Sequence, residues 1–216
     1  YWFRRAFTHR MANISLMMID PHSYAESFIS EDEVKKSARA RGEEIGVIDA
    51  TTGAGAYLKH LAHNLSAQSV VEIGTGSGVG ALWVLEGMLA SGTLTSIDDE
   101  MEHSNIAKTA FQDAQIAPAR FRLITNPVMD VMNKLADRAY DLVIFRHNPE
   151  DLPYAITEAH RILRSGGVFV IDNFFGGSKV SDPAQRDPKT VALRESGKSL
   201  KNESENWVVS LIPTGD

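Results

Sequence analysis

The feature that most constrains this chain is a glycine-rich stretch that follows a short apolar run. Residues 70–80 read VVEIGTGSGVG, which places glycine at every second position from Gly74 to Gly80. A strand that ends in such a loop and continues into a helix leaves backbone amides and a helix N-terminus at its carboxyl end. The stretch therefore predicts a ligand-binding loop at the edge of a parallel sheet.

Short apolar runs alternate with helical segments from residue 69 onward, which is typical of strand–helix–strand units. We expect strands at residues 69–73, 92–97, 121–125, 141–145, 168–172 and 207–213. We expect helices at residues 78–90, 103–115, 127–137, 150–164 and 187–203, preceded by helices over 31–41 and 53–65. A capping box from Ser30 to Glu33 should start the first of these helices, and Gly166-Gly167 should form the turn into the fifth strand. The series predicts an α/β fold with a doubly wound, mostly parallel sheet and helices on both faces.

Composition is that of an ordinary globular protein and excludes several functional classes. The chain has 216 residues, of which 43% are hydrophobic, so one large domain is expected. A net charge of −6 argues against a surface that tracks nucleic-acid phosphates. The lack of cysteine excludes disulfides, thiolate metal sites and a cysteine nucleophile, and no apolar run approaches the ~20 residues of a membrane span. We therefore expect a cytoplasmic protein without a nucleic-acid or membrane partner.

The first 27 residues are predicted to form an N-terminal arm or extension, and residues 28–216 the main domain. The arm carries large apolar side chains, namely Trp2, Phe3, Phe7, Leu16, Met17 and Met18. Because so many apolar groups are poorly tolerated in water, the arm should pack on its own domain or on a second subunit. We expect a homodimer.

Two acidic residues near the glycine loop narrow the choice of ligand. Asp98 closes the second predicted strand about 20 residues after the loop, where such folds place an acid that binds ribose hydroxyls. The segment Gly76-x-Gly78-x-x-Ala81 also fits the dinucleotide fingerprint, so a nicotinamide-dependent oxidoreductase is one interpretation. Glu72 lies inside the first strand, where an acid is costly unless it meets a polar ligand group. A cationic ligand explains Glu72 better than a pyrophosphate does.

With these residues the chain resembles the S-adenosylmethionine-dependent O-methyltransferases of the catechol and caffeoyl-CoA type. The likeness extends over residues 28–216 and is carried by Glu72–Gly78, Ala81–Trp83, Leu94–Asp98 and the Asp172-Asn173 pair. The later stretch Asp182–Glu195 and the ending Leu211–Asp216 are similar to small bacterial members. The resemblance implies a class I, Rossmann-like domain, S-adenosylmethionine as cofactor, and a small hydroxylated molecule as methyl acceptor.

The resemblance also implies roles for residues around the loop. The backbone near Gly74 and Ser77 passes the methionine part of the cofactor, and Glu72 lies near its cationic end. Asp98 holds the ribose hydroxyls, and the loop at residues 125–128 contacts the adenine edge. The implied cofactor-binding residues are Glu72, Gly74, Thr75, Gly76, Ser77, Asp98, Asp99, Asn126, Pro127 and Val128.

The chain departs from the family after the fourth strand. Metal-dependent members carry an aspartate ligand there, a lysine base three residues later, and an Asp-Asn pair after the fifth strand that completes the oxygen ligands. Here Arg146 stands at the aspartate position and Pro149 at the lysine position. A guanidinium has no acceptor and cannot bind a cation, so we expect no metal and an ion pair between Arg146 and Asp172. Alternatively, Arg146 orients a carboxylate or phenolate acceptor.

The candidate catalytic residues are therefore Arg146, His147, Asp172 and Asn173. His147 is the only base in its loop that titrates near neutral pH. The neighbouring Phe174 and Phe175 either wall an acceptor pocket or belong to the core. Three functions stay open: a metal-independent O-methyltransferase, a cofactor-binding protein with lost or altered catalysis, and the nicotinamide-dependent oxidoreductase.

Overall fold

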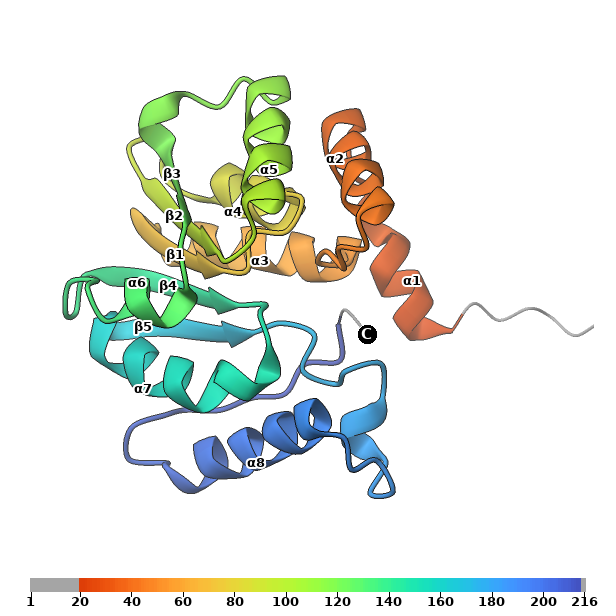
Figure 1. Cartoon of the computed structure of the whole chain (residues 1–216), viewed down its shortest axis with the longest axis vertical. Coiled ribbons are helices and arrows are strands. Elements are labelled where there is room, and N and C mark those ends of the chain that lie inside the picture. The colour runs from red at the N-terminus through yellow and green to blue at the C-terminus, as the bar shows by residue number, and fades with distance from the viewer. Residues whose placement is uncertain (1–19, 215–216) are drawn as a thin grey trace, which may run out of the picture.

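The predicted parallel sheet is present. The structure, a computed structural model, describes residues 20–214, so most of the predicted N-terminal arm lies outside the described residues. Within these residues the strands are β1 (Ser69–Ile73), β2 (Thr93–Asp98), β3 (Phe121–Thr125), β4 (Tyr140–Phe145) and β5 (Leu163–Ile171). They run parallel in the order β3-β2-β1-β4-β5 (Figure 1). The strand order reverses between β1 and β4, and ligands of open α/β sheets bind at such a switch point.

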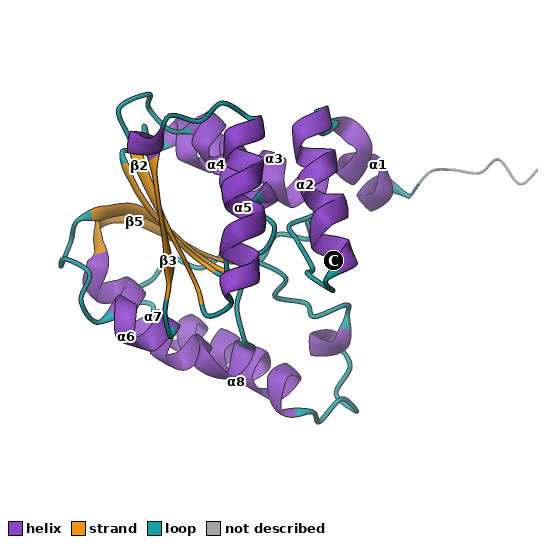
Figure 2. Ribbon diagram, turned by 45° about the horizontal axis from the view of Figure 1, so that its top comes forward, coloured by secondary structure: helices purple, strands orange, loops and turns teal. Residues whose placement is uncertain are grey.

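Helices cover both faces of the sheet, as expected (Figure 2). One face carries α2 (Glu33–Glu44), α3 (Thr52–Asn64), α4 (Val79–Gly87) and α5 (Met101–Asp113), and α1 (Pro21–Phe28) packs against α3. The other face carries α6 (Val128–Met132), α7 (Leu152–Ile162) and α8 (Pro188–Asn202). Short 3-10 helices span Pro118–Arg120, Pro149–Asp151 and Lys179–Ser181. Between residues 20 and 214 no helix has the length and apolar character needed to cross a bilayer.

Two apolar cores, one on each face, hold the layers together. Because successive side chains of a strand point to opposite faces, Val70 belongs to one core and Val71 to the other. The core under α2–α5 includes Leu58, Trp83, Leu94, Phe111, Leu142 and Ile144, and the core under α6–α8 includes Ile73, Ile97, Val143, Phe145, Ile156 and Ile162. Glu72 faces the side of α2–α5 by the same alternation and is fully buried. An acid therefore lies in this layer two residues before the glycine loop.

The start of α2 differs from the prediction. Asp32, and not Ser30, caps the helix by accepting a hydrogen bond from Lys35 N at 2.9 Å, and the helix runs to Glu44 instead of ending near residue 41. Asp32 Oδ2 also pairs with Lys35 Nζ at 2.5 Å, and Lys35 is buried. A carboxylate that satisfies both a free amide and a buried ammonium is a better cap than the Ser30 hydroxyl.

The helix predicted over residues 127–137 is shorter than expected. α6 ends at Met132, after which Lys134 N and Leu135 N donate to carbonyls three residues back at 3.0 and 3.1 Å. Such tight bonds close the last turn of a helix and end it.

The sixth strand predicted at residues 207–213 is absent, because this tail pairs with no strand of the described chain. Val208 and Val209 are exposed, although an apolar run with β-branched residues favours a strand. Side-chain contacts hold the tail instead: the Trp207 and Phe169 ring centroids lie 6.0 Å apart, and His22 Nδ1 lies 3.1 Å from Pro213 O. An apolar run becomes a strand only where a neighbouring strand offers backbone partners.

β5 is longer than predicted and begins where α7 ends. Gly166 and Gly167 lie inside it, at a shift of register opposite Tyr140 and Leu142, and do not form a turn before it. Gly166 has a φ of 75°, which favours glycine and lets the strand absorb the irregularity without ending. The strand then brings Asp172 to the carboxyl edge of the sheet beside β4.

Candidate functional site

The glycine loop connects β1 to α4 and needs its glycines for close packing. Gly74 has a φ of 92°, and a Cβ on it would lie 1.8 Å from the carbonyl oxygen of Arg146. Gly78 has a φ of 88°, and a Cβ on it would lie 3.0 Å from the backbone of Ala107 on α5. The loop therefore lies directly against the end of β4 and against α5. A side chain at either glycine would prevent this close contact.

Asp98, at the end of β2, fixes the middle of the loop. Its Oδ2 accepts hydrogen bonds from Thr75 N at 2.8 Å and Gly76 N at 3.2 Å. Its Oδ1 accepts one from Glu100 N at 2.9 Å and lies 3.0 Å from His103 Nδ1. Asp98 is buried, and both of its oxygens are engaged. A ribose hydroxyl bound by Asp98 would therefore share a carboxylate oxygen with the hydrogen bonds that are already present.

Asp49 fixes the far end of the loop. It lies between α2 and α3, with Oδ1 accepting a hydrogen bond from Ser77 N at 3.1 Å and Oδ2 one from Ser77 Oγ at 2.6 Å. Both residues are buried, and a Cβ on Gly42 would lie 2.8 Å from Ser77 Cβ and 3.1 Å from Asp49 Oδ2. Sequence analysis missed Asp49 because its partner is far away in the chain; the acid between two predicted helices was the only available signal.

Glu72, Arg146 and Asp172 form a charged row across the ends of β1, β4 and β5. Arg146 Nε donates to Asp172 Oδ2 at 2.7 Å, which confirms the ion pair predicted from the sequence. Arg146 Nη1 lies 3.7 Å from Glu72 Oε1, close enough for charge attraction but too far for a hydrogen bond. Glu72 Oε2 accepts from Ser96 Oγ at 2.7 Å, whereas Glu72 Oε1 and both Nη atoms of Arg146 are buried without a hydrogen-bond partner.

Burial and charge set the protonation of this row. Burial raises the pKa of Glu72 to about 7, although Arg146 and the Ser96 hydroxyl oppose the rise. Burial lowers the pKa of Arg146, but the carboxylates of Asp172 and Glu72 outweigh it and hold the pKa above its ordinary value. Arg146 is therefore a permanent buried cation, and Glu72 is an acid that changes charge near neutral pH.

Gly80, in the first turn of α4, makes room for the row. A Cβ on Gly80 would lie 2.6 and 2.8 Å from Arg146 Nη1 and Nη2, and 2.9 Å from Glu72 Oε1. Sequence analysis treated Gly80 as the end of the glycine-rich pattern. A glycine inside a helix is unfavourable and often marks a close approach, which was the signal for this contact.

The residues after β4 and β5 do not fit the divalent-metal site of metal-dependent members. Arg146 takes the aspartate position, and its guanidinium already occupies Asp172 Oδ2. Asp172 Oδ1 accepts from Asn173 N at 2.9 Å, and Asn173 has a φ of 57°. Among residues 20–214 no three His, Asp or Glu side chains are grouped so as to hold a metal. The residues at these two strand ends therefore do not provide the oxygen ligands of the family's metal site.

His147 lies between two acids from different loops. Its Nε2 is 3.4 Å from Asp99 Oδ2 and 3.5 Å from Asp151 Oδ2. Asp99 Oδ1 also accepts from Val128 N at 2.9 Å, which brings the predicted adenine loop next to His147. In that loop Asn126 and Pro127 are exposed, whereas the Val128 side chain is buried in the core. Because its amide donates to Asp99 and its side chain is buried, Val128 has no free donor for a ligand in this arrangement.

A cavity of about 630 Å³ opens beside the charged row. Asp172 and Asn173 line it together with Phe174 and Phe175, and Tyr57 of α3 lines it from another element. Phe174 also packs against the core under α6–α8, so one side chain serves both of the roles left open for it. The cavity is predominantly apolar with a few polar groups at one end, as expected of a small-molecule site.

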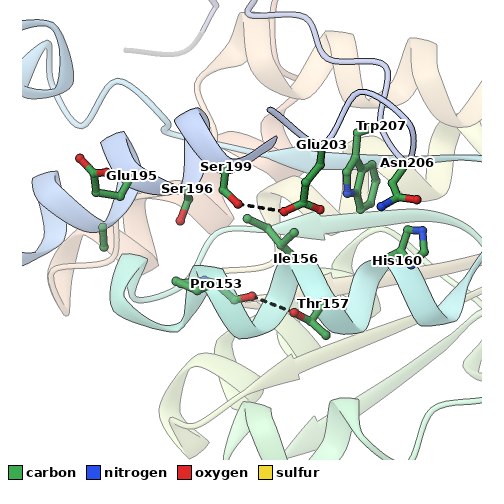
Figure 3. A pocket seen from close by; sticks show the side chains of 11 residues that line it. Pro153, Ile156, Thr157, His160, Glu195, Ser196, Ser199, Glu203, Asn206 and Trp207 are labelled. Carbon is green, nitrogen blue, oxygen red and sulfur yellow. Dashed lines mark hydrogen bonds between the residues drawn. The ribbon is translucent and has the colours of Figure 1, made fainter. Parts of the chain in front are cut away.

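A second cavity, of about 430 Å³, lies between α7 and α8 (Figure 3). Ser196, Glu203 and His160 line it, and Ser199 Oγ donates to Glu203 Oε1 at 2.9 Å. This cavity lies on the face of α6–α8, away from Glu72 and Arg146, and no site residue predicted from the sequence lines it. The charged row and the glycine loop are therefore the better candidate site.

Comparison with known proteins gives the same family as the residues do. Residues 20–216 match the family model described as O-methyltransferase. A Mycobacterium marinum protein named as an O-methyltransferase is 44% identical over 194 residues, which are 90% of this chain and 86% of that protein. A solved Corynebacterium glutamicum structure is 30% identical with a TM-score of 0.81, covering 89% of this chain and 90% of that one.

One further solved structure carries a ligand in its description. The O-methyltransferase TomG from Streptomyces achromogenes, described as involved in tomaymycin synthesis and in complex with SAM, is 26% identical with a TM-score of 0.73. The match covers 83% of this chain and 82% of that chain. The fold, the glycine loop and these matches together establish that the chain belongs to the O-methyltransferase family.

Proposed function

We propose that this protein is an S-adenosylmethionine-dependent O-methyltransferase that acts on a small hydroxylated acceptor without a divalent metal. The observation that carries the proposal is the charged row. At the switch point of the sheet, Arg146 neutralises Asp172 at 2.7 Å where metal-dependent members hold a cation. The glycine loop beside it keeps the form that the family uses for its cofactor.

The residues present fit the cofactor. Glu72 is fully buried, and its Oε1 has no hydrogen-bond partner, so it suits the cationic end of the ligand. Asp98 and Asp99 would hold the ribose, and the loop at residues 125–128 would lie along the adenine edge. When bound, S-adenosylmethionine supplies a methyl group on a positively charged sulfur.

The chain must then align the acceptor and remove a proton from its hydroxyl group. His147 is the candidate base, because Asp99 and Asp151 flank its ring at 3.4 and 3.5 Å and would stabilise the proton that it takes up. Asn173 and Arg146 are candidates for orienting the acceptor oxygen, and the cavity walled by Phe174 would enclose the acceptor's apolar part. In this scheme Arg146 supplies the fixed positive charge at the site.

Chelation tests the metal-free scheme. Methyl transfer to catechol-like and other hydroxylated acceptors should proceed at the same rate in EDTA and in added magnesium. Arg146→Asp should lower this rate at least about tenfold without magnesium, because it leaves Glu72 and Asp172 beside a third carboxylate. The exposed Arg186→Asp is the matched charge-reversal control and should retain full activity. Magnesium dependence of the unmutated protein would contradict the proposal.

A second function is favoured by the same row. Pro149 replaces the lysine base, and Asp172 is occupied by Arg146, so a cofactor-binding protein with lost or altered catalysis is the alternative. Calorimetry combined with the methyl-transfer assay separates the two functions, because both predict cofactor binding but the alternative predicts no turnover of any acceptor.

We propose in addition that the protein forms a homodimer through its N-terminal region. The apolar side chains of residues 1–19 lie outside the described residues, but exposed Tyr24, Phe28 and Ile29 continue the apolar character into the described chain. The cytoplasmic location and the absence of a nucleic-acid partner stay predictions from the sequence.

A further inference from the structure

We propose that Asp49 binds the amino group of the cofactor's methionyl end, so that the site recognises this end of the ligand by its positive charge. The inference rests on the proposed function, because it takes S-adenosylmethionine as the ligand of the glycine loop. Glu72 is the acid assigned above to the cationic end of the ligand, and Asp49, which holds Ser77, is a second acid beside the same loop.

The five backbone amides from Gly74 to Gly78 are already occupied, so none of these five is free for an anionic ligand group. Asp98 accepts from the amides of Thr75 and Gly76, and Asp49 accepts from the amide and hydroxyl of Ser77. The amides at the two ends are also used, by Ile97 O for Gly74 and by Thr75 O for Gly78. A carboxylate or phosphate that binds these five amides would have to displace one of their acceptors, whereas an ammonium would not.

The charge beside the loop is predominantly negative. Asp49, Glu72 and Asp98 all adjoin the loop, and Asp49 is one of the groups whose charge raises the pKa of Glu72. Arg146 is the buried cation facing them, and it already pairs with Asp172. A ligand carboxylate placed among these acids is repelled, whereas an ammonium is attracted.

Asp49 lies over the glycine loop, close to Gly76. A Cβ on Gly76 would lie 2.9 Å from Asp49 Oδ1 and 3.1 Å from Val47 Cγ1, so the segment that carries Asp49 lies directly on Gly76. A carboxylate offers about four acceptor sites, and Ser77 uses two of them. The remaining sites can accept from an ammonium that passes the loop, while Ser77 keeps the carboxylate in place.

Calorimetry with three matched ligands tests the proposal. S-adenosylhomocysteine, its analogue without the carboxylate and its analogue without the amino group all carry a neutral sulfur and differ only at the methionyl end. With the unmutated protein, loss of the amino group should weaken binding at least about tenfold, and loss of the carboxylate less than about threefold.

Asp49→Asn supplies the second measurement. It should weaken binding of the two ligands that carry an amino group at least about tenfold and leave the third ligand unchanged. The matched control is the exposed Asp137→Asn, which makes the same chemical change and removes an ion pair with Arg161. This variant should bind all three ligands as the unmutated protein does. If Asp49→Asn does not fold, the ligand series with the unmutated protein still decides the question.

Two results would overturn the proposal and leave the proposed function standing. One is tighter binding of S-adenosylhomocysteine to Asp49→Asn, which means that Asp49 competes with the ligand carboxylate for Ser77. The other is a larger loss on removing the carboxylate than on removing the amino group. Failure of the unmutated protein to bind either S-adenosylmethionine or S-adenosylhomocysteine would overturn the cofactor assignment together with this inference.

Discussion

At the scale of single residues, Glu72 and Arg146 depend on each other. Glu72 is fully buried and the Arg146 side chain is only 9% exposed, and an isolated charge in such a position is very costly. Glu72 avoids much of that cost by taking up a proton near neutral pH, and Arg146 by pairing with Asp172. Removing either residue therefore changes the protonation or the pairing of the other.

The raised pKa of Glu72 predicts a pH dependence of stability. Its value of about 7 in the folded chain exceeds the ordinary 4.5, so the folded state binds more protons than the unfolded state between these values. The free energy of unfolding should fall as pH rises through this window, by about 3 kcal/mol. Glu72→Gln should remove this slope. Urea unfolding of both proteins at pH 5 and pH 8 checks it, and parallel profiles would contradict it.

Gly80 gives a second prediction at the same scale. Gly80→Ala should raise helix propensity, yet it places a methyl group against the Arg146 guanidinium and Glu72 Oε1. The expected result is a protein destabilised by about 1–3 kcal/mol, because buried charged groups must shift. Gly80 lies in α4 and has no positive φ, so backbone strain does not contribute to this loss. Equal or greater stability of Gly80→Ala would show that the charged row can move freely.

At the scale of elements, the glycine loop is held from two sides, by β2 through Asp98 and by the α2–α3 segment through Asp49. Asp98→Ala should leave the buried amide of Thr75 and the amide of Gly76 without acceptors and lower the free energy of unfolding by about 2–3 kcal/mol even without ligand. Asp113→Ala, which removes a partly exposed ion pair with Arg41, should change it by less than about 1 kcal/mol. Denaturant unfolding of the two variants makes the comparison. A similar small effect in both would mean that the loop does not need Asp98.

The elements that the sequence predicted are those whose signal is local. The strands from β1 to β4 follow from apolar runs bounded by turns, and the Arg146–Asp172 pair follows from two residues at matching strand ends. The strand expected at residues 207–213 has the apolar run of a strand, but pairing depends on a neighbouring strand that the run does not specify. The contact of Asp49 with Ser77 joins residues far apart in the sequence, so no local pattern could predict it.

At the scale of the whole molecule, the N-terminal region leads to a prediction about assembly. Tyr24, Phe28 and Ile48 are exposed in the described chain, with 57, 69 and 78% of their surfaces accessible. A homodimer that covers such groups should sediment at twice the chain mass at micromolar concentration. Deleting residues 1–20 should produce a monomer. A monomeric full chain, or an unchanged dimer after the deletion, would exclude assembly through this region.

The guanidinium of Arg146 is joined to the polypeptide by covalent bonds, and this distinguishes it from any dissolved cation. Its presence beside Asp172 follows no binding isotherm, so neither the concentration nor the identity of ions in the surrounding solution changes its occupancy. It also cannot be exchanged for an ion of another radius or coordination number. The spacing of charges at this edge of the sheet is therefore encoded in the gene and is independent of the ionic environment in which the protein is made.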